Sequence, residues 1–409
     1  MFYYLPYHIS ILLTCFIVKS KINGLVKMTV CKRKKRAFIW LSTPLLVSIF
    51  LTIHTVFRYQ PQSIEIEKSS SVKFDDNSHN VIRETALPSP RIINTFSNKT
   101  IVYISNTTFK VNTSACEHWF EPTFVENLKV VSNYPRGNVT EYFLKIGGNL
   151  TQPKQMMTKF PVLVTAASSG HFKVSQGLLK SIHEILMPKY GDVKIIYYDM
   201  GLLSDQLIAL EKYCRCEVRK FPFSDLPKHV SLLKTYTWKP IIVKMLLMEY
   251  GWVWYMDSSA RFTTNDLDLP LKYSLDNSVL YFTYGNSLSV AQHTDKRTVA
   301  YLGEDMCKYR YFGELEAGFV LYHFDHVTSV IVDQWVSCAL VQDCMAPAGA
   351  KLGCNNKITT DAQCHRYDQA VLSIIIRRLF HEINDYPNVI KPFRIHVIRR
   401  GDGVNYFPI

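Results

Sequence analysis

A single acid ends an apolar run in the middle of the chain. Residues 252–256 read WVWYM, and Asp257 follows them directly. A carboxylate in this position can supply one ligand to Mg²⁺ or Mn²⁺, which prefer oxygen donors. Two residues later stands Ser259, a weak and neutral ligand. We expect a retained but weak metal site; the alternative is an aspartate that caps the SSAR turn.

Two later acids have the chemistry of proton acceptors. Glu316 lies in ELEAGFVLY and Asp368 in HRYDQA. A carboxylate beside a reacting hydroxyl can take its proton as a new bond forms. The alternatives are a helix N-cap for Asp368 and a strand-edge position for Glu316.

Basic side chains accompany these acids along the chain. If no metal is bound, fixed cations must stabilise an anionic leaving group. The candidates are Lys239, Lys244, Arg261 and Arg366. For each of them the alternative is a solvated charge on a helix surface.

The segment TAASSGHF, residues 165–172, forms a second candidate ligand loop. Its small residues allow a ligand to approach the backbone, and Gly170 permits a tight turn. The candidate contacts are Thr165, Ala166, Ser168 and Gly170. The segment matches neither a dinucleotide nor a Walker motif, and a plain strand-to-helix turn is the alternative.

Alternating strand and helix patterns must position these residues. Short apolar runs and amphipathic segments alternate from about residue 159 to Asp257, which predicts a parallel sheet covered by helices on both faces. Ligands bind such sheets at the carboxyl ends of the strands. After Asp257 the order is mixed, with strands expected at 279–285, 314–324 and 393–398, and helices at 327–341 and 368–380. The fold class is therefore an α/β mixed sheet flanked by helices, in a domain over residues 156–409.

The N-terminal third has a different composition. Most of the formal charge of +13 comes from a basic tail, residues 1–36, so the chain carries no general signal for nucleic-acid binding. Residues 37–57 contain no charged residue and are long enough, at roughly 30 Å, to span a bilayer. The basic cluster before them predicts a type II signal anchor with the C-terminal domain in the lumen. Met28 is a candidate natural start.

The segment that follows, residues 58–155, resembles a glycosylated stem. It is rich in Ser, Asn and Thr, and short strand-like runs indicate that its later part is partly folded. The N-glycosylation sequons of the chain all fall within it. They are at Asn98, Asn106, Asn112, Asn138 and Asn149.

Eight of the ten cysteines follow the apolar segment. An even number in a secretory compartment predicts disulfides, although the pairing stays open. The cluster before the last helix consists of Cys338, Cys344, Cys354 and Cys364. A zinc site is its alternative, but the spacing lacks close CxxC pairs.

The order of these motifs resembles the GT-A fold of nucleotide-diphospho-sugar transferases. VWYMDSS is similar to the strand that precedes their DxD metal motif, EAGFVLYHF to a downstream strand, and HRYDQAVLSIII to a later helix. Residues 159–409 also resemble a metazoan family of type II membrane proteins to which this fold is assigned.

The resemblance implies a glycosyltransferase of the Golgi or endoplasmic reticulum. Its substrates would be a nucleotide-sugar donor and a glycan or glycoprotein acceptor, with Mn²⁺ or Mg²⁺ as the metal. Donor contacts would include Gln369 and, in branches without a DxD motif, Lys or Arg. The alternatives are a catalytically inactive domain that binds glycans or partners, and a Rossmann-type methyltransferase. The lack of a Gly-rich loop disfavours the methyltransferase.

Overall fold

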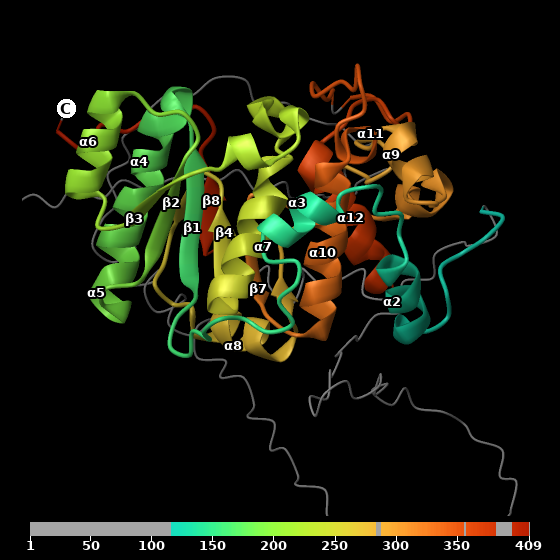
Figure 1. Ribbon diagram of the computed structural model, residues 1–409, viewed down its shortest axis with the longest axis horizontal. Coiled ribbons are helices and arrows are strands. Elements are labelled where there is room, and N and C mark those ends of the chain that lie inside the picture. The colour runs from blue at the N-terminus through green and yellow to red at the C-terminus, as the bar shows by residue number, and fades with distance from the viewer. Residues whose placement is uncertain (1–115, 284–287, 356, 382–394, 409) are drawn as a thin grey trace, which may run out of the picture. The chain divides into compact units, whose positions relative to one another are not determined.

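The computed structural model describes residues 116–283, 288–355, 357–381 and 395–408, which belong to one compact unit (Figure 1). The predicted basic tail, the apolar segment 37–57 and the sequons at Asn98, Asn106 and Asn112 lie outside the described residues. Within the described ranges, no helix is both long and apolar enough to cross a membrane.

One mixed sheet of six strands forms the centre of the described domain, with the order β3-β2-β1-β4-β7-β6. β1 pairs in parallel with β2 and β4, and β2 with β3. β7 runs antiparallel to its neighbours β4 and β6. This arrangement confirms the predicted mixed α/β class. The strands are β1 (Val162–Ala167), β2 (Ile195–Asp199), β3 (Glu217–Lys220), β4 (Trp252–Met256), β6 (Val279–Leu280) and β7 (Phe319–His323).

The sheet registers β1 and β4 so that both end at the same edge. Val164 lies opposite Tyr255 in this pair. All residues of β1 and β4 are buried, as continuous apolar strands between two layers should be. The loops that leave these two strands, 168–171 and 257–259, therefore start side by side.

Helices flank the sheet at both of its ends. Figure 1 shows α6, α4 and α5 toward the end of the sheet where β3 lies, and α10, α12 and α2 toward the opposite end. α10 packs against α7, α12 and α2. The helices are α2 (Phe124–Ser132), α3 (Thr140–Lys145), α4 (Phe172–Ser181), α5 (Met187–Tyr190), α6 (Ser204–Tyr213), α7 (Trp238–Tyr250), α8 (Asp268–Asp276), α9 (Lys296–Tyr301), α10 (His326–Leu340), α11 (Gln342–Met345) and α12 (Tyr367–Leu379).

α7 is the central helix of the domain. Nearly all of its residues are buried, including two lysines. It ends at Gly251, whose φ of 69° lies in the left-handed region that glycine adopts easily. The chain then turns directly into β4. The helix that carries Lys239 is therefore followed at once by the strand that precedes Asp257.

The folded region begins well before residue 156, which corrects the expected domain boundary. Phe120, Phe124 and Leu128 belong to the hydrophobic core, and α2 packs against α10 and α12. A disulfide joins Cys116 to Cys307. The apolar residues of α2 recur at helical spacing but lie between polar, sequon-rich segments, so composition hides them. The sequon asparagines Asn138 and Asn149 are exposed.

Three more disulfides join the remaining cysteines of the domain. Cys338 pairs with Cys344 and Cys354 with Cys364, which confirms two disulfides in the cluster before α12. Cys214 pairs with Cys216. A disulfide that closes a loop stabilises the fold mainly by restricting the unfolded chain.

A short second sheet, the β5–β8 ribbon, anchors the C-terminal end. β5 (Ala260–Phe262) pairs antiparallel with β8 (His396–Ile398). The chain after β8 is then fixed to α4, because the buried Gln176 side chain accepts hydrogen bonds from the backbone N–H groups of Tyr406 and Phe407 at 2.7 and 2.8 Å. β5 was not among the predicted strands, since three residues beside Asp257 give no periodic signal.

Candidate functional site

A pocket of about 480 Å³ opens at the carboxyl ends of β1 and β4. Its walls come from the loops after these strands, the start of α7, the start of α12 and the segment after β8. The lining residues include Ala166, Ser168, His171, Lys234, Tyr236, Lys239, Asp257, Ser259, Leu352, Arg366, Asp368, Gln369 and Arg400. This position is where open α/β sheets bind ligands.

Lys239 connects the two acids of the pocket. Its Nζ lies 3.1 Å from Asp257 Oδ1 and 2.7 Å from Asp368 Oδ2. The lysine and Asp368 side chains are only 3% and 5% exposed, whereas Asp257 is 36% exposed. The Nζ also lies 5.3 Å from the ring centroids of Tyr236 and Tyr255, within the range of a cation–π contact. The ammonium group is therefore held from several sides.

Burial and the shared lysine control the charges of this trio. Burial raises the pKa of Asp368 to about 6, although the nearby Lys239 opposes the rise. For Lys239, burial favours the neutral form, but the two carboxylates outweigh it and raise the pKa above its usual value. Lys239 therefore stays charged, and Asp368 keeps its proton to a higher pH than an ordinary aspartate.

Asp257 is fixed by its surroundings rather than free at a strand end. Its Oδ1 accepts a hydrogen bond from the Tyr255 hydroxyl at 3.1 Å in addition to the contact with Lys239. Its backbone N–H donates to the carbonyl of Gly318 at 2.7 Å. A Cβ at position 318 would lie 2.4 Å from Asp257 Oδ2, so only glycine leaves room for this carboxylate. The AG pair before β7 has this packing role.

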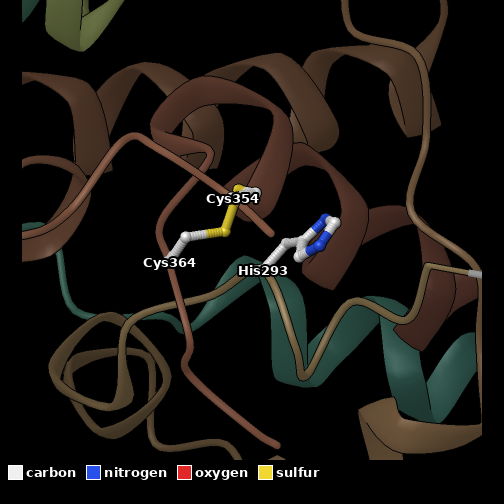
Figure 2. Close-up of side chains that lie close together, drawn as sticks. All are labelled: His293, Cys354 and Cys364. Carbon is white, nitrogen blue, oxygen red and sulfur yellow. A yellow bond between two sulfur atoms is a disulfide. The ribbon is translucent and has the colours of Figure 1, made fainter. Parts of the chain in front are cut away.

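The residues around Asp257 do not make a protein-held divalent-metal site. A hard cation needs several oxygen ligands, commonly one or two carboxylates. In the pocket, Oδ1 of Asp257 already carries two donors, Asp368 is buried against the same lysine, and Ser259 adds only a hydroxyl. Among the described residues, His293 lies close to the sulfurs of Cys354 and Cys364, but those two sulfurs are joined in a disulfide (Figure 2).

Further basic residues line the same pocket. Arg366 is half-buried, and its Nε lies 3.2 Å from Cys354 Sγ, so the disulfide loop supports it. Lys234 and Arg400 are exposed at the rim. Four permanently basic side chains thus face two carboxylates, which favours an anionic ligand.

The loop after β1 contributes backbone and small side chains. Ala166 and Ser168 line the pocket, whereas Gly170 is exposed and does not. Thr165 is fully buried within β1, and its hydroxyl has no hydrogen-bond partner among the described residues. On α12, Gln369 lines the pocket and its buried Nε2 likewise lacks a described partner. An unpaired buried amide is a candidate ligand contact.

Three charged sequence candidates lie away from the pocket. The guanidinium of Arg261 donates to the backbone carbonyls of Ser258, Ala260, Val174 and Asp402. Its donors therefore hold the β5 region to α4 and to the C-terminal segment, and we do not place a ligand on it.

Glu316 and Lys244 are each bound to a partner. Glu316 Oε2 lies 2.9 Å from Nε2 of His396, and both side chains are about nine-tenths buried. Lys244 Nζ lies 2.7 Å from Asp333 Oδ1, on the side of α7 that faces α10. Neither residue lines the pocket.

Sequence reasoning missed Arg400, Tyr236 and Lys234. Arg400 reaches the pocket only because β8 pairs with β5, and no local pattern indicates that pairing. Tyr236 has a φ of 54°, a left-handed conformation that is rare for an aromatic residue. Such strain often marks a functional segment, but it cannot be read from residue types.

Comparisons with known proteins give a family match and remote structural similarities. A family described as a protein of unknown function (DUF1647) matches residues 148–244, which include β1, α4 and the start of α7. No curated protein matches the sequence.

Several solved structures that the chain resembles are glycosyltransferases. The WbbM bifunctional glycosyltransferase has 10% identity and a TM-score of 0.34, over 56% of this chain and 39% of that one. Core-mannan synthase A of Aspergillus fumigatus, in a Mn/GDP form, has 8% identity and a TM-score of 0.32, over 70% and 82%. Mouse xyloside xylosyltransferase 1 has 11% identity and a TM-score of 0.31, over 55% and 83%. At these TM-scores the pocket geometry, and not the similarity, carries the functional argument.

Proposed function

We propose that this protein is a glycosyltransferase that moves a sugar from a nucleotide-sugar donor to a glycan or glycoprotein acceptor. The observation that carries the proposal is the basic pocket at the carboxyl ends of β1 and β4, in which Lys239 joins Asp257 to Asp368. A nucleoside diphosphate is an anion, and its charge complements the basic side chains that line this pocket. A pocket of about 480 Å³ falls in the range of small-molecule sites.

Each group in the pocket has a distinct role in this proposal. Lys239, Arg366 and Arg400 stabilise the diphosphate as the bond between the sugar and its phosphate oxygen breaks. The backbone around Ala166 and the amide of Gln369 contact the donor. A bond forms between the acceptor oxygen and the sugar, and the acceptor proton passes to a pocket carboxylate. Asp257 is the more exposed of the two, and Asp368 keeps the lysine in place.

Fixed cations are proposed in place of a tightly held metal. Lys239 already neutralises charge on the two acids that a metal would use. Donor binding should therefore persist in the presence of a chelator. Ser259→Asp, which adds a carboxylate beside Asp257, should create or strengthen a response to Mn²⁺. A donor affinity that collapses on chelation in the unaltered protein would instead assign a metal to Asp257.

The direct test measures donor binding and turnover by the full chain. A thermal-shift panel of nucleotide sugars should raise the melting temperature with a subset of donors, because a ligand stabilises the state that it binds. S-adenosylmethionine serves as the control for the methyltransferase alternative. Release of nucleoside diphosphate in the presence of acceptor glycans then separates an enzyme from an inactive binding domain. Binding of S-adenosylmethionine alone would overturn the proposal.

The proposed setting is the membrane of the Golgi or endoplasmic reticulum, with residues 58–409 in the lumen. It rests on the basic tail, the uncharged segment 37–57 and the sequons that follow them. The four disulfides of the domain are compatible with an oxidising compartment. In intact microsomes, added protease should spare the C-terminal domain, and glycosidase should reduce the apparent mass. Cleavage of that domain would show that it faces the cytoplasm, against the proposed orientation.

A further inference from the structure

Basic side chains continue past the pocket on the surface beside it. Arg400 lines the pocket, and so do His171 and Val174 near the start of α4. Lys173 and Arg399 are the neighbours of these residues in the chain; both are exposed, and neither lines the pocket. We call Lys173 and Arg399 the flanking cations. They have no role in the sugar transfer as proposed above.

The start of α4 and the chain after β8 lie in direct contact. The backbone N–H of Val404 donates to the carbonyl of Lys173 at 2.8 Å. The guanidinium of Arg261 joins the same two segments, because it donates to the carbonyls of Val174 and Asp402 at 2.8 and 3.1 Å. The flanking cations therefore belong to one surface, although they are far apart in the sequence.

The charges of this surface are not balanced by its own acids. Burial lowers the pKa of Arg261, Asp402 opposes that effect, and the nearby charge of Arg399 adds to it. Asp402, the exposed acid of this segment, thus partly balances Arg261. Among the described residues, neither Lys173 nor Arg399 forms an ion pair. Exposed cations beside a basic pocket attract anionic groups to its mouth.

The flanking cations adjoin the loop that carries the more exposed acid of the pocket. The backbone N–H of Arg399 donates to the carbonyl of Ser259 at 2.8 Å, and Ser259 stands two positions after Asp257. In the proposed transfer the acceptor hydroxyl must reach a pocket carboxylate, and Asp257 is 36% exposed whereas Asp368 is 5% exposed. The part of the acceptor next to that hydroxyl would then lie over the 257–259 loop, beside Arg399.

We propose that the acceptor is an acidic glycan whose carboxylate or sulfate groups bind Lys173 and Arg399. The inference rests on the proposed sugar transfer and names the acceptor class for that site. Lys239, Arg366 and Arg400 are assigned to the diphosphate, so the flanking cations supply charge that a neutral acceptor would not use. A guanidinium can bind a planar carboxylate through two parallel hydrogen bonds, and an ammonium adds a point charge. Because both side chains are exposed, salt should weaken the binding.

The test measures the binding of oligosaccharides to the full chain in a neutral detergent, with and without a nucleotide-sugar donor. The probes are three fluorescent chondroitin hexasaccharides: the sulfated form, the unsulfated form, and an unsulfated form whose carboxylates are reduced to alcohols. At least one acidic form should bind about tenfold more tightly than the neutral form, the scale of two exposed ion pairs. The comparison of the two acidic forms tells carboxylate binding from sulfate binding.

Two double variants that lose the same charge provide the matched control. Lys173→Gln with Arg399→Gln should weaken binding of the acidic hexasaccharides by about tenfold and leave binding of the neutral form unchanged. Lys129→Gln with Lys272→Gln, at two exposed lysines that do not line the pocket, should leave all three affinities unchanged. Melting curves check that both double variants fold.

Equal affinity for the acidic and neutral hexasaccharides would overturn the proposal, as would the absence of binding to all three. An equal loss in the two double variants would also overturn it, because net charge alone would then explain the binding. Thermal shift with nucleotide sugars measures donor binding separately. If no donor binds while the flanking cations still select the acidic glycan, the proposed sugar transfer fails and the glycan site stands. If a donor binds without that selection, only the acidic acceptor is refuted.

Discussion

The pocket and the β5–β8 ribbon bury charged side chains in opposite ways. In the pocket, Lys239 contacts two carboxylates and still faces the cavity. In the ribbon region, the guanidinium of Arg261 donates to backbone carbonyls, and the buried carboxylate of Glu316 contacts His396. A buried charge is therefore available for chemistry only when its partners leave one side open to a cavity.

The largest expected effect comes from removing the lysine at the centre of the pocket. Lys239→Met leaves Asp368 buried without its cation, which should cost about 3 to 5 kcal/mol in the free energy of unfolding. Lys244→Met, on the same helix, breaks the pair with Asp333 and provides the control. Urea unfolding and nucleotide binding are measured for both. Only the Lys239 variant should lose donor binding. Equal losses of donor affinity in both variants would contradict the proposed role of Lys239 in the pocket.

The second effect concerns the titration of Asp368. Its pKa of about 6 in the folded chain lies above the ordinary value of about 3.9, so between these pH values the folded chain holds a proton that the unfolded chain has lost. The contribution of this group to stability therefore falls as pH rises from about 4 to 6.

Asp368→Asn removes that dependence while keeping the side-chain volume. The difference in unfolding free energy between variant and unaltered protein should shift by about 2 kcal/mol in favour of the variant from pH 4 to pH 7. Urea unfolding at several pH values measures it. A difference that stays constant over this range would contradict the raised pKa.

The third prediction compares Arg366 of the pocket with Arg261 of the ribbon region. Arg366→Ala should weaken donor binding by about 1.5 to 3 kcal/mol, the scale of a hydrogen bond to a charged group. Arg261→Ala should instead lower the melting temperature, because the backbone carbonyls it serves lose their donors, and leave donor affinity in the folded protein nearly unchanged. Isothermal titration at a temperature where both variants are folded separates the two results. The reverse pattern would indicate that the diphosphate binds at the ribbon and not in the pocket.

The smallest effect is expected at Glu316. Glu316→Gln keeps the shape of a side chain that does not line the pocket, so donor affinity should change by less than about 0.5 kcal/mol. Asp257→Asn is its matched counterpart in the pocket and should abolish turnover. Competition binding and product release are measured for both variants. A turnover defect in Glu316→Gln as large as that of Asp257→Asn would show that the ribbon takes part in the reaction.

Local sequence patterns predicted most of the parallel half of the fold. The runs that became β1, β2 and β4 are mostly apolar, and α6, α7 and α10 have the length and spacing of helices. The predicted helix over 173–187 was nearly correct: α4 ends at Ser181 and a π-helical turn, Ile182–Leu186, follows it. Of the strand expected at 279–285, the described residues 279–283 form the two-residue β6, and the rest of that range lies outside the described residues.

The sequence indicated Asp257 because it ends an apolar run, and Lys239, Arg366 and Asp368 because of their charge, whereas Gln369 came from the resemblance to GT-A enzymes. Only the tertiary structure decided which of them meet. The parallel register of β1 and β4 sets the edge, and the approach of α12 brings Asp368 within 2.7 Å of a lysine 129 positions earlier. Arg261 and Glu316 looked equivalent to these residues in the sequence, but the long-range pairing of β5 with β8 turned them away from the pocket. Sequence patterns encode contacts between near neighbours, whereas the partner of a buried charge depends on packing between distant segments.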